Sequence, residues 1–238
     1  MKVEAQRVGE NVDPNVIREN IAYLRNVLGI RYLHLSEKVA GSLLPQDSAI
    51  EAAAELLDFE KSVSDCQSCK LSRGRKNVVF GDGAVGAEIM FVGEGPGEQE
   101  DVLGIPFVGP EGQLLTKMIA AMGLRRDDVY IGNVIKCRPP LDRNPEVDEI
   151  AQCFPFLEKQ IALVRPKIIV ALGDVAAKAL LKTDEPVSRL RGTIRESAGV
   201  KTVVTYHPSS LLQNPELKKV VWEDLQQVMA ELGLKKTR

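Results

Sequence analysis

The feature that most constrains this chain is a regular alternation of short apolar runs with longer amphipathic segments, which begins after Cys69. Strands are expected at residues 87–93, 129–135, 167–172 and 202–206. Helices are expected at residues 110–122, 146–164, 174–182 and 215–232. Alternation of this kind is typical of right-handed crossovers, which place helices on both faces of a parallel sheet. The sequence therefore predicts an α/β fold.

Residues 1–60 differ from the rest and are expected to form a helical extension of unknown role. Helices are expected at residues 11–29 and from Asp47 to about Val63, where apolar residues recur at helical spacing. The whole chain carries 31 basic and 33 acidic residues. Because this balance is close to neutral, the chain cannot hold nucleic acid by bulk charge alone, and any such contact must be local.

The sequence shows neither a membrane span nor a signal peptide. No apolar run approaches the ~18 residues that a span needs, and residues 1–7 contain no apolar segment of the signal-peptide kind. We therefore expect a soluble, cytoplasmic protein that does not contact a membrane.

Four cysteines indicate a metal or redox site. Cys66 and Cys69 form a Cys-x-x-Cys pair, Cys137 ends an apolar strand, and Cys153 lies on a helix that follows Pro145. In a cytosolic protein such a pair indicates metal or redox chemistry rather than a structural disulfide. Four thiolates can hold zinc or an iron–sulfur cluster, and one close pair with two distant single cysteines favours the cluster. Alternatively, Cys137 and Cys153 are small buried core residues, or Cys66 and Cys69 form a redox sensor.

Polar residues follow the predicted strands at positions that should converge. Glu94 and Gly95 follow the first strand, Asn133 lies near the end of the second, Asp174 follows the third and His207 follows the fourth. Ligands of parallel α/β proteins bind outside the carboxyl ends of the strands. We therefore expect these residues to meet at one edge of the sheet.

Three side chains near this edge suit a planar base. Phe107, on a loop between two prolines and two glycines, can stack on a base, and Asn133 can read the edge of a pyrimidine. His207 is better placed for chemistry than the other histidine, His34. The glycine-rich loop at 93–97 has acidic neighbours and lacks dinucleotide spacing, so it suits an uncharged ligand better than a phosphate. Each residue alone is also compatible with an ordinary core or turn role.

Four motifs occur in unbroken order. They are Gly93-Glu94-Gly95-Pro96-Gly97-Glu98, Gly104 to Gly109 with Phe107, Asn133 to Pro140 with Cys137, and His207-Pro208-Ser209. With the four cysteines, they closely resemble the iron–sulfur (family 4) uracil-DNA glycosylases over roughly residues 62–232. The resemblance implies a three-layer α/β/α fold with a four-stranded parallel sheet, in which residues 61–238 form the catalytic domain. It also implies a 4Fe-4S cluster on Cys66, Cys69, Cys137 and Cys153, with zinc as the alternative.

The activity implied by the resemblance is that of a monofunctional uracil-DNA glycosylase. Such an enzyme flips deoxyuridine out of DNA and hydrolyses the N-glycosidic bond, which leaves an abasic site for base excision repair. Phe107 would stack on uracil, Asn133 would read its edge, and His207 would stabilise the departing anion beside Gly95. Glu94 would support the sugar cation or position water, with Glu100 as a weaker alternative.

The expected partner is uracil-containing DNA, single- or double-stranded, bound by a monomer. DNA contacts are expected from Arg138, Arg143, Ser209 and Leu211, and Lys136 could also meet phosphates. Leu211, like its neighbour Leu212, is either a candidate wedge for the gap left by the flipped base or the start of a core helix. Asp142 stands where we expect asparagine in this family, so the role of that asparagine is not transferred. The alternative from another class is a noncatalytic nucleic-acid-binding module that holds an iron–sulfur cluster or zinc.

Overall fold

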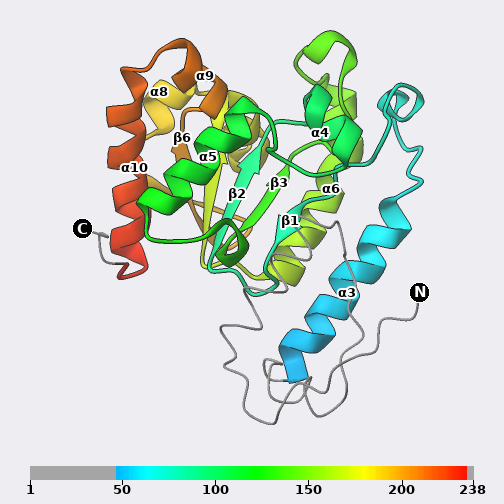
Figure 1. Ribbon diagram of the computed structural model, residues 1–238, viewed down its shortest axis with the longest axis horizontal. Coiled ribbons are helices and arrows are strands. Elements are labelled where there is room, and N and C mark those ends of the chain that lie inside the picture. The colour runs from blue at the N-terminus through cyan, green and yellow to red at the C-terminus, as the bar shows by residue number, and fades with distance from the viewer. Residues whose placement is uncertain (1–46, 235–238) are drawn as a thin grey trace, which may run out of the picture. The chain divides into compact units, whose positions relative to one another are not determined.

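The computed structural model describes residues 47–234, and the helix expected at 11–29 lies outside them (Figure 1). The strands are β1 (Asp82–Gly83), β2 (Ile89–Gly93), β3 (Tyr130–Asn133), β4 (Ile168–Leu172), β5 (Ile194–Ser197) and β6 (Val200–Thr205). The α-helices are α3 (Asp47–Val63), α4 (Glu98–Leu103), α5 (Pro110–Ala121), α6 (Val147–Val164), α7 (Gly173–Leu181), α8 (Val187–Leu190), α9 (Pro208–Gln213) and α10 (Leu217–Glu231). None of the helices in this part of the chain is long and apolar enough to cross a membrane.

The strands form one sheet with the order β1-β3-β2-β4-β6-β5. The four inner strands are parallel and correspond to the four strands expected from the sequence. Every residue of β2, β3 and β4 is buried, as both faces of a parallel sheet are covered by helices. The expected alternation of strands and helices is therefore confirmed.

The expected count of four strands is corrected to six by two short antiparallel edge strands, β1 and β5. β1 contains only two residues, and three of the four residues of β5 are exposed. Neither segment can show the apolar run that identifies a buried strand, which is why the sequence pattern did not predict them.

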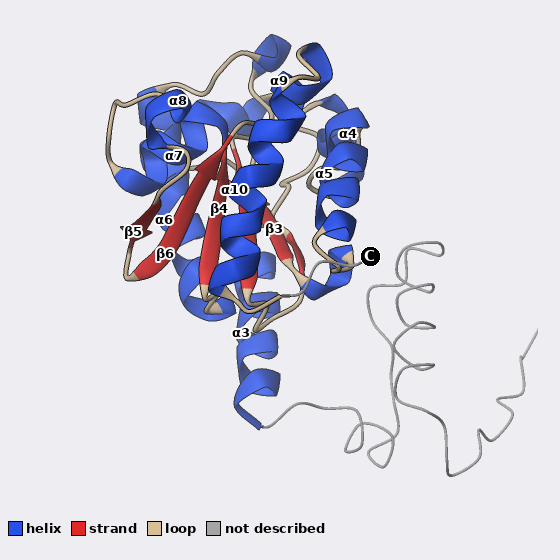
Figure 2. Cartoon of the chain, turned by 90° about the vertical axis from the view of Figure 1, so that its left-hand side faces the viewer, coloured by secondary structure: helices blue, strands red, loops and turns tan. Residues whose placement is uncertain are grey.

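Helices cover both faces of the sheet and make three layers. On one face, Met90 and Val92 of β2 share a core with Leu157 of α6 and with residues of α3 and α7. On the other face, Phe91 packs with Leu225 of α10 and with residues of α5. Figure 2 shows α10 in front of the sheet and α6 and α7 behind it. Successive residues of β2 point to opposite faces, so one strand supplies both cores.

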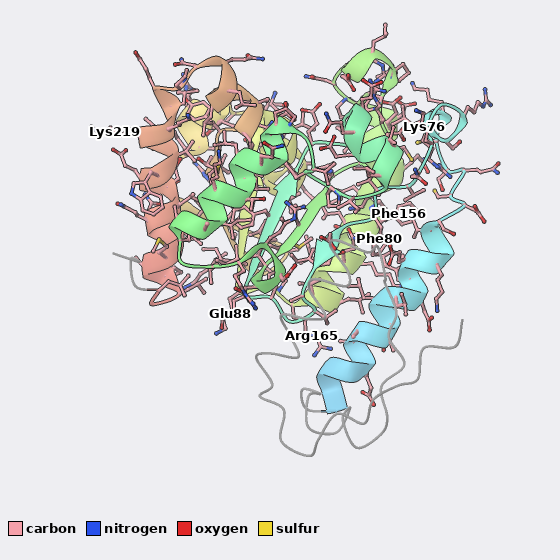
Figure 3. The ribbon with its side chains drawn as sticks, in the orientation of Figure 1. Lys76, Phe80, Glu88, Phe156, Arg165 and Lys219 are labelled. Atoms are coloured by element: carbon pink, nitrogen blue, oxygen red, sulfur yellow. The ribbon has the colours of Figure 1, made fainter. Side chains whose placement is uncertain are left out.

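The helix α3 contributes to the first of these cores. Leu56 and Phe59 are buried within it. The Phe59 ring meets Phe80 and Phe156 edge-on, with ring centroids 5.4 and 6.1 Å away, and Figure 3 labels both partners beside α3. The last turns of α3 therefore pack with the sheet, and the chain leaves this helix directly into the Cys66 segment.

A buried polar network holds the carboxyl end of β6. The Asp224 carboxylate of α10 is fully buried and accepts hydrogen bonds from Thr205 Oγ1 at 2.7 Å and from Arg191 Nη2 at 2.9 Å. Arg191 also donates to the Val220 carbonyl at 3.1 Å. Since Thr205 lies two residues before His207, this network fixes the strand end from which the His207 segment leaves the sheet.

We predict that Asp224→Ala destabilises the protein by about 3 kcal/mol, because it leaves the Arg191 cation and the Thr205 hydroxyl without their buried acceptor. Urea denaturation measures the free energy of unfolding. The control is Glu223→Ala, which removes an exposed carboxylate 3.7 Å from the same guanidinium and should cost less than about 0.5 kcal/mol. Equal effects of the two substitutions would contradict the assigned role of Asp224.

Candidate active site

A cleft of about 570 Å³ opens at the carboxyl edge of the sheet. Its lining includes several residues expected from the sequence: Glu94, Gly95, Arg143, His207 and Ser209. The loop after β2, the N-terminus of α5, the segment after β3 and the start of α9 all contribute to it. Figure 1 shows α4 and α9 at the same end of the sheet. The predicted convergence of strand ends is therefore present for three of the four segments. Asp174, after the third predicted strand, does not line the cleft, and its carboxylate accepts a hydrogen bond from Val187 N at 2.8 Å.

Phe107 and Asn133 do not line this cleft but lie buried beside His207. The ring centroids of Phe107 and His207 are 5.6 Å apart. Gly93, at the end of β2, pairs with Asn133 of β3 in the sheet. A Cβ atom on Gly93 would come within 2.5 Å of both Asn133 Oδ1 and Phe107 Cζ. The three side chains therefore occupy one neighbourhood, and they can do so only because residue 93 lacks a side chain.

The Phe107 loop is held rigidly in an unusual conformation. Phe107 has a φ of 52°, which places it in the left-handed region that non-glycine residues avoid. The Arg126 guanidinium donates to the Phe107 carbonyl at 3.1 Å and to the Pro106 carbonyl. Gly112 of α5 lies so close that a Cβ there would be 1.8 Å from Phe107 O. These contacts fix the ring that is expected to stack on a base.

Glu100 has a structural role in the same loop. Its Oε1 atom accepts hydrogen bonds from Val108 N at 2.9 Å and Gly109 N at 3.0 Å, at the N-terminus of α5. A carboxylate there is stabilised by the helix dipole and by these amide donors. Glu100 is therefore committed to the Phe107 loop, which argues against its expected alternative role at the sugar.

Asn133 holds a buried acceptor that no hydrogen bond within residues 47–234 satisfies. Its residue is 1% exposed, and its Oδ1 atom is buried with no hydrogen-bond partner among the described residues. An unpaired buried acceptor costs about 1–3 kcal/mol, so it is normally satisfied. The backbone beside it is fixed, since Val134 N donates to Gly93 O at 2.9 Å. Asn133 Oδ1 therefore remains able to accept a hydrogen bond.

The hydrogen bonds and burial of His207 favour a neutral ring that can donate from Nε2. Its Nδ1 atom accepts from Ser209 N at 3.3 Å and lies 2.8 Å from Ser209 Oγ. Accepting at Nδ1 leaves the proton of the neutral ring on Nε2. Burial lowers the pKa of His207 to about 4, so the ring stays uncharged at neutral pH. Ser209, expected as a DNA contact, is thus also the residue that orients the histidine.

Two carboxylates face the cleft near His207. Burial raises the pKa of Glu94, and the negative charge of Glu111 raises it further. Burial likewise raises the pKa of Glu111, with added repulsion from Glu100 and Asp142. The sequence analysis missed Glu111, because nothing distinguishes it from any acidic residue in the first turn of a helix. The cleft therefore favours neutral or cationic groups beside Glu94.

Among the expected DNA contacts, Leu211 is corrected by the structure. It is 1% exposed and belongs to the core between α9 and α10, so it cannot serve as a wedge. Its neighbour Leu212 is 46% exposed. The sequence analysis missed Leu141, which is 97% exposed, has a φ of 57° and lies between the cleft-lining residues Pro139 and Asp142. Apolar side chains at the cleft rim therefore come from Leu141 and Leu212.

The two arginines expected at DNA are engaged in ion pairs. Arg138 holds the Asp142 carboxylate through two hydrogen bonds of 2.7 and 3.0 Å, and this contact lowers the pKa of Asp142. Arg143 binds the buried carboxylate of Glu149 at 2.6 and 2.8 Å. Both arginines thus order the segment after β3. Their positive charge is partly neutralised by the Asp142 and Glu149 carboxylates.

The four cysteines line one cavity on the other side of the β3 end. This cavity is small, with a volume of about 10 Å³, and none of the four thiols forms a disulfide. Cys137 Sγ accepts from Arg75 Nη1 at 3.4 Å, and Cys153 Sγ accepts from Lys136 N at 3.2 Å. Burial raises the pKa of Cys153 to about 11 and raises that of Cys137. The expected convergence of the four cysteines is therefore present.

The fold and the site define a parallel α/β protein in which a cluster of Asn133, Phe107 and His207 lies at the carboxyl ends of the strands, together with a separate four-cysteine cavity. A model of the Uracil DNA glycosylase superfamily matches residues 80–226. The chain is 47% identical to the Type-4 uracil-DNA glycosylase of Saccharolobus solfataricus, over 73% of this chain and 84% of that protein. It is 45% identical to that of Thermotoga maritima (72% and 92%) and 40% identical to that of Archaeoglobus fulgidus (75% and 94%). The chain belongs to the uracil DNA glycosylase superfamily and, within it, to the type-4 family.

We predict that Gly93→Ala lowers the free energy of unfolding by about 1–3 kcal/mol, because the added methyl group would overlap Asn133 and Phe107. Gly74→Ala is the matched control. Gly74 has a φ of −111° and no atom within 4 Å of its would-be Cβ, so this substitution should raise stability by roughly 0.4–1 kcal/mol. Urea denaturation of both variants provides the comparison, and a stable Gly93→Ala protein would show that the packing is looser than described.

We predict that the His207 ring titrates with a pKa near 4, well below the usual value of about 6.5. The charged form is disfavoured by burial, so protonation should begin only as the pH falls toward that value. NMR of protein labelled at histidine, with His207→Gln used to assign the signal, follows the titration directly. A midpoint near pH 6.5 would show that the ring is open to solvent.

Proposed function

We propose that this protein is a monofunctional uracil-DNA glycosylase that flips deoxyuridine out of DNA and hydrolyses its N-glycosidic bond. The observation that carries the proposal is the unpaired, buried Oδ1 acceptor of Asn133 next to Phe107 and His207. Family membership supports the same reaction. The product would be an abasic site, which is the substrate for later steps of base excision repair.

The recognition step follows from the donors and acceptors of the base. In uracil, N3–H is a donor and O4 is an acceptor, which complement the Oδ1 and Nδ2 atoms of Asn133. In cytosine these two positions are reversed, so both groups of Asn133 would be left unpaired in a dry site. A site built to pair polar groups rejects such a ligand strongly. Phe107 would supply the stacking surface that holds the base flat.

The bond-breaking step places negative charge on uracil and positive charge on the sugar. The Nε2–H of neutral His207 would donate to uracil O2, with backbone N–H groups near Gly95 as further donors. Glu94 would face the cationic sugar or orient the attacking water. The C1′–N1 bond breaks, and the oxygen of water bonds to C1′. One proton of that water stays on the new C1′ hydroxyl group, and the other neutralises the uracil anion. No covalent link to the protein forms in this scheme.

The four cysteines would hold a 4Fe-4S cluster. Among the described residues, no group of three or more His, Cys, Asp or Glu side chains is arranged to hold a single metal ion. Tetrahedral zinc, with Zn–S bonds of about 2.3 Å, needs sulfur atoms within about 4 Å of one another, so zinc remains the weaker alternative. A cluster is larger and spans a wider set of thiolates. When bound, it would anchor the segments of Cys66, Cys69, Cys137 and Cys153 around the site without touching the scissile bond.

The DNA strands would be held at the cleft rim. Leu141 and Leu212 are the exposed apolar side chains there, and each could fill the gap left by the flipped base. Arg138, Arg143 and Ser209 would approach the phosphates while they order the rim. Uracil-containing DNA, single- or double-stranded, is thus the proposed partner, bound by a cytoplasmic monomer.

We predict that Asn133→Ala lowers the rate of uracil excision at least ~100-fold, because it removes both polar contacts to the base, while affinity for undamaged duplex DNA is retained. The assay incubates the protein with a uracil-containing oligonucleotide, adds alkali and measures strand scission. Asn144→Ala, at an exposed asparagine of the same cleft, is the control and should excise normally. DNA binding by the native protein without any scission would favour the noncatalytic module instead.

A further inference from the structure

We propose that Lys136 is the positioning residue for Asn133 and that its buried charge links the base-reading strand end to the four-cysteine cavity. The inference rests on the proposed function and assigns a role to a residue that touches neither the base nor the sugar. It concerns the segment from Asn133 to Cys137, which joins the two sites along the chain.

The burial of Lys136 is the first observation. Its residue is 1% exposed and ranks among the largest fully buried side chains of the described structure. Its Nζ atom donates to Asn133 O at 2.7 Å and to Gln160 Oε1 at 2.6 Å, and both acceptors are uncharged. A buried ammonium group is costly, and two neutral oxygens compensate it only partly. A leucine or methionine would pack there at lower cost, so stability alone does not explain the lysine.

The contact with Asn133 O explains what the side chain does. Lys136 turns back over three residues and fixes the peptide that follows the Asn133 Cα. On the other side of the same turn, Val134 N donates to Gly93 O at 2.9 Å and Ile135 N donates to Glu94 O at 3.1 Å. Asn133 Oδ1 has no partner in the described residues, so its direction depends on the backbone that carries it. Lys136 thereby aims the acceptor that reads uracil.

The Gln160 contact fixes the lysine in turn. Gln160 is fully buried on α6, and its Nε2 atom donates to Phe80 O at 2.8 Å and to Tyr130 Oη at 3.1 Å. With both donors occupied, its Oε1 atom faces Lys136. The ammonium group is therefore held between the end of β3 and the C-terminal part of α6, in a position set by the fold.

The link to the cysteines uses the backbone and the charge of Lys136. Lys136 N donates to Cys153 Sγ at 3.2 Å, Cys137 is the next residue, and Lys136 lines the cysteine cavity. A group held by four thiolates is anionic, so the adjacent buried cation offsets its charge at low local dielectric. One side chain therefore stabilises the cysteine-bound group and positions the base reader.

The test compares Lys136→Met with native holoprotein. Methionine fills similar space without donors, so we expect a roughly tenfold or greater rise in the inhibition constant of free uracil and in KM, with a smaller change in kcat. We also expect the reduction potential of the cluster to become more negative, because a nearby positive charge is lost. Lys167→Met makes the same change at an exposed lysine at the amino end of β4 and should alter neither value.

Lys136→Gln separates the two roles. Its amide can still donate to Asn133 O but carries no charge, so we expect uracil affinity to recover at least partly while the reduction potential stays shifted. Native uracil affinity in Lys136→Met would overturn the positioning role. A reduction potential equal to that of the native protein in Lys136→Gln would overturn the link between Lys136 and the cysteine-bound cluster. This test does not depend on whether Lys136→Met folds. If the native protein neither binds nor excises uracil, the proposed function is wrong. This outcome is seen in the native protein alone, so it is distinguishable from a failure of the Lys136 proposal, which is seen only in the variants.

Discussion

The site depends on the space left by one missing side chain at the end of β2. Parallel pairing places Gly93 opposite Asn133, so the strand register brings the Asn133 amide to the carboxyl ends of the strands. Any Cβ at residue 93 would occupy the volume in which the amide and the Phe107 ring meet. Glycine is required here because neighbouring side chains approach its Cα closely. The sequence alone shows only a glycine at the end of an apolar run.

Around that space, the polar groups are arranged before any ligand arrives. The His207 ring is neutral and oriented by Ser209, the Phe107 loop is held by Arg126 and Glu100, and Asn133 keeps an acceptor unpaired. Fixed groups of this kind stabilise developing charge without reorganising during the reaction. The cost is local: a strained residue, a partly buried imidazole and an unsatisfied oxygen, each supported by the packed sheet behind it.

The sequence predicted the parts of the fold that have a strong apolar period. β2 and β4 are continuous buried runs and α6 is a long amphipathic helix with Cys153 on its inner face, so they were found. The edge strands β1 and β5 carry no such run. The sequence left Leu211 open between a wedge and a core leucine, because the two have the same sequence signature and only packing separates them. Glu111 was not assigned to the site, because its significance comes from neighbours distant in the chain. Lys136 was expected to meet DNA phosphates, and this prediction is wrong because the residue is only 1% exposed.

The arrangement of the cysteines has a consequence for the order in which the protein matures. The four thiols come from three separate places: the segment after α3, the end of β3, and α6. A nascent chain released only as far as Cys137 has three of them and lacks the helix that brings the fourth. If the four thiols hold the proposed cluster, the complete ligand set exists only once α6 has packed against the sheet, so a chain that fails to fold would also lack the site for it.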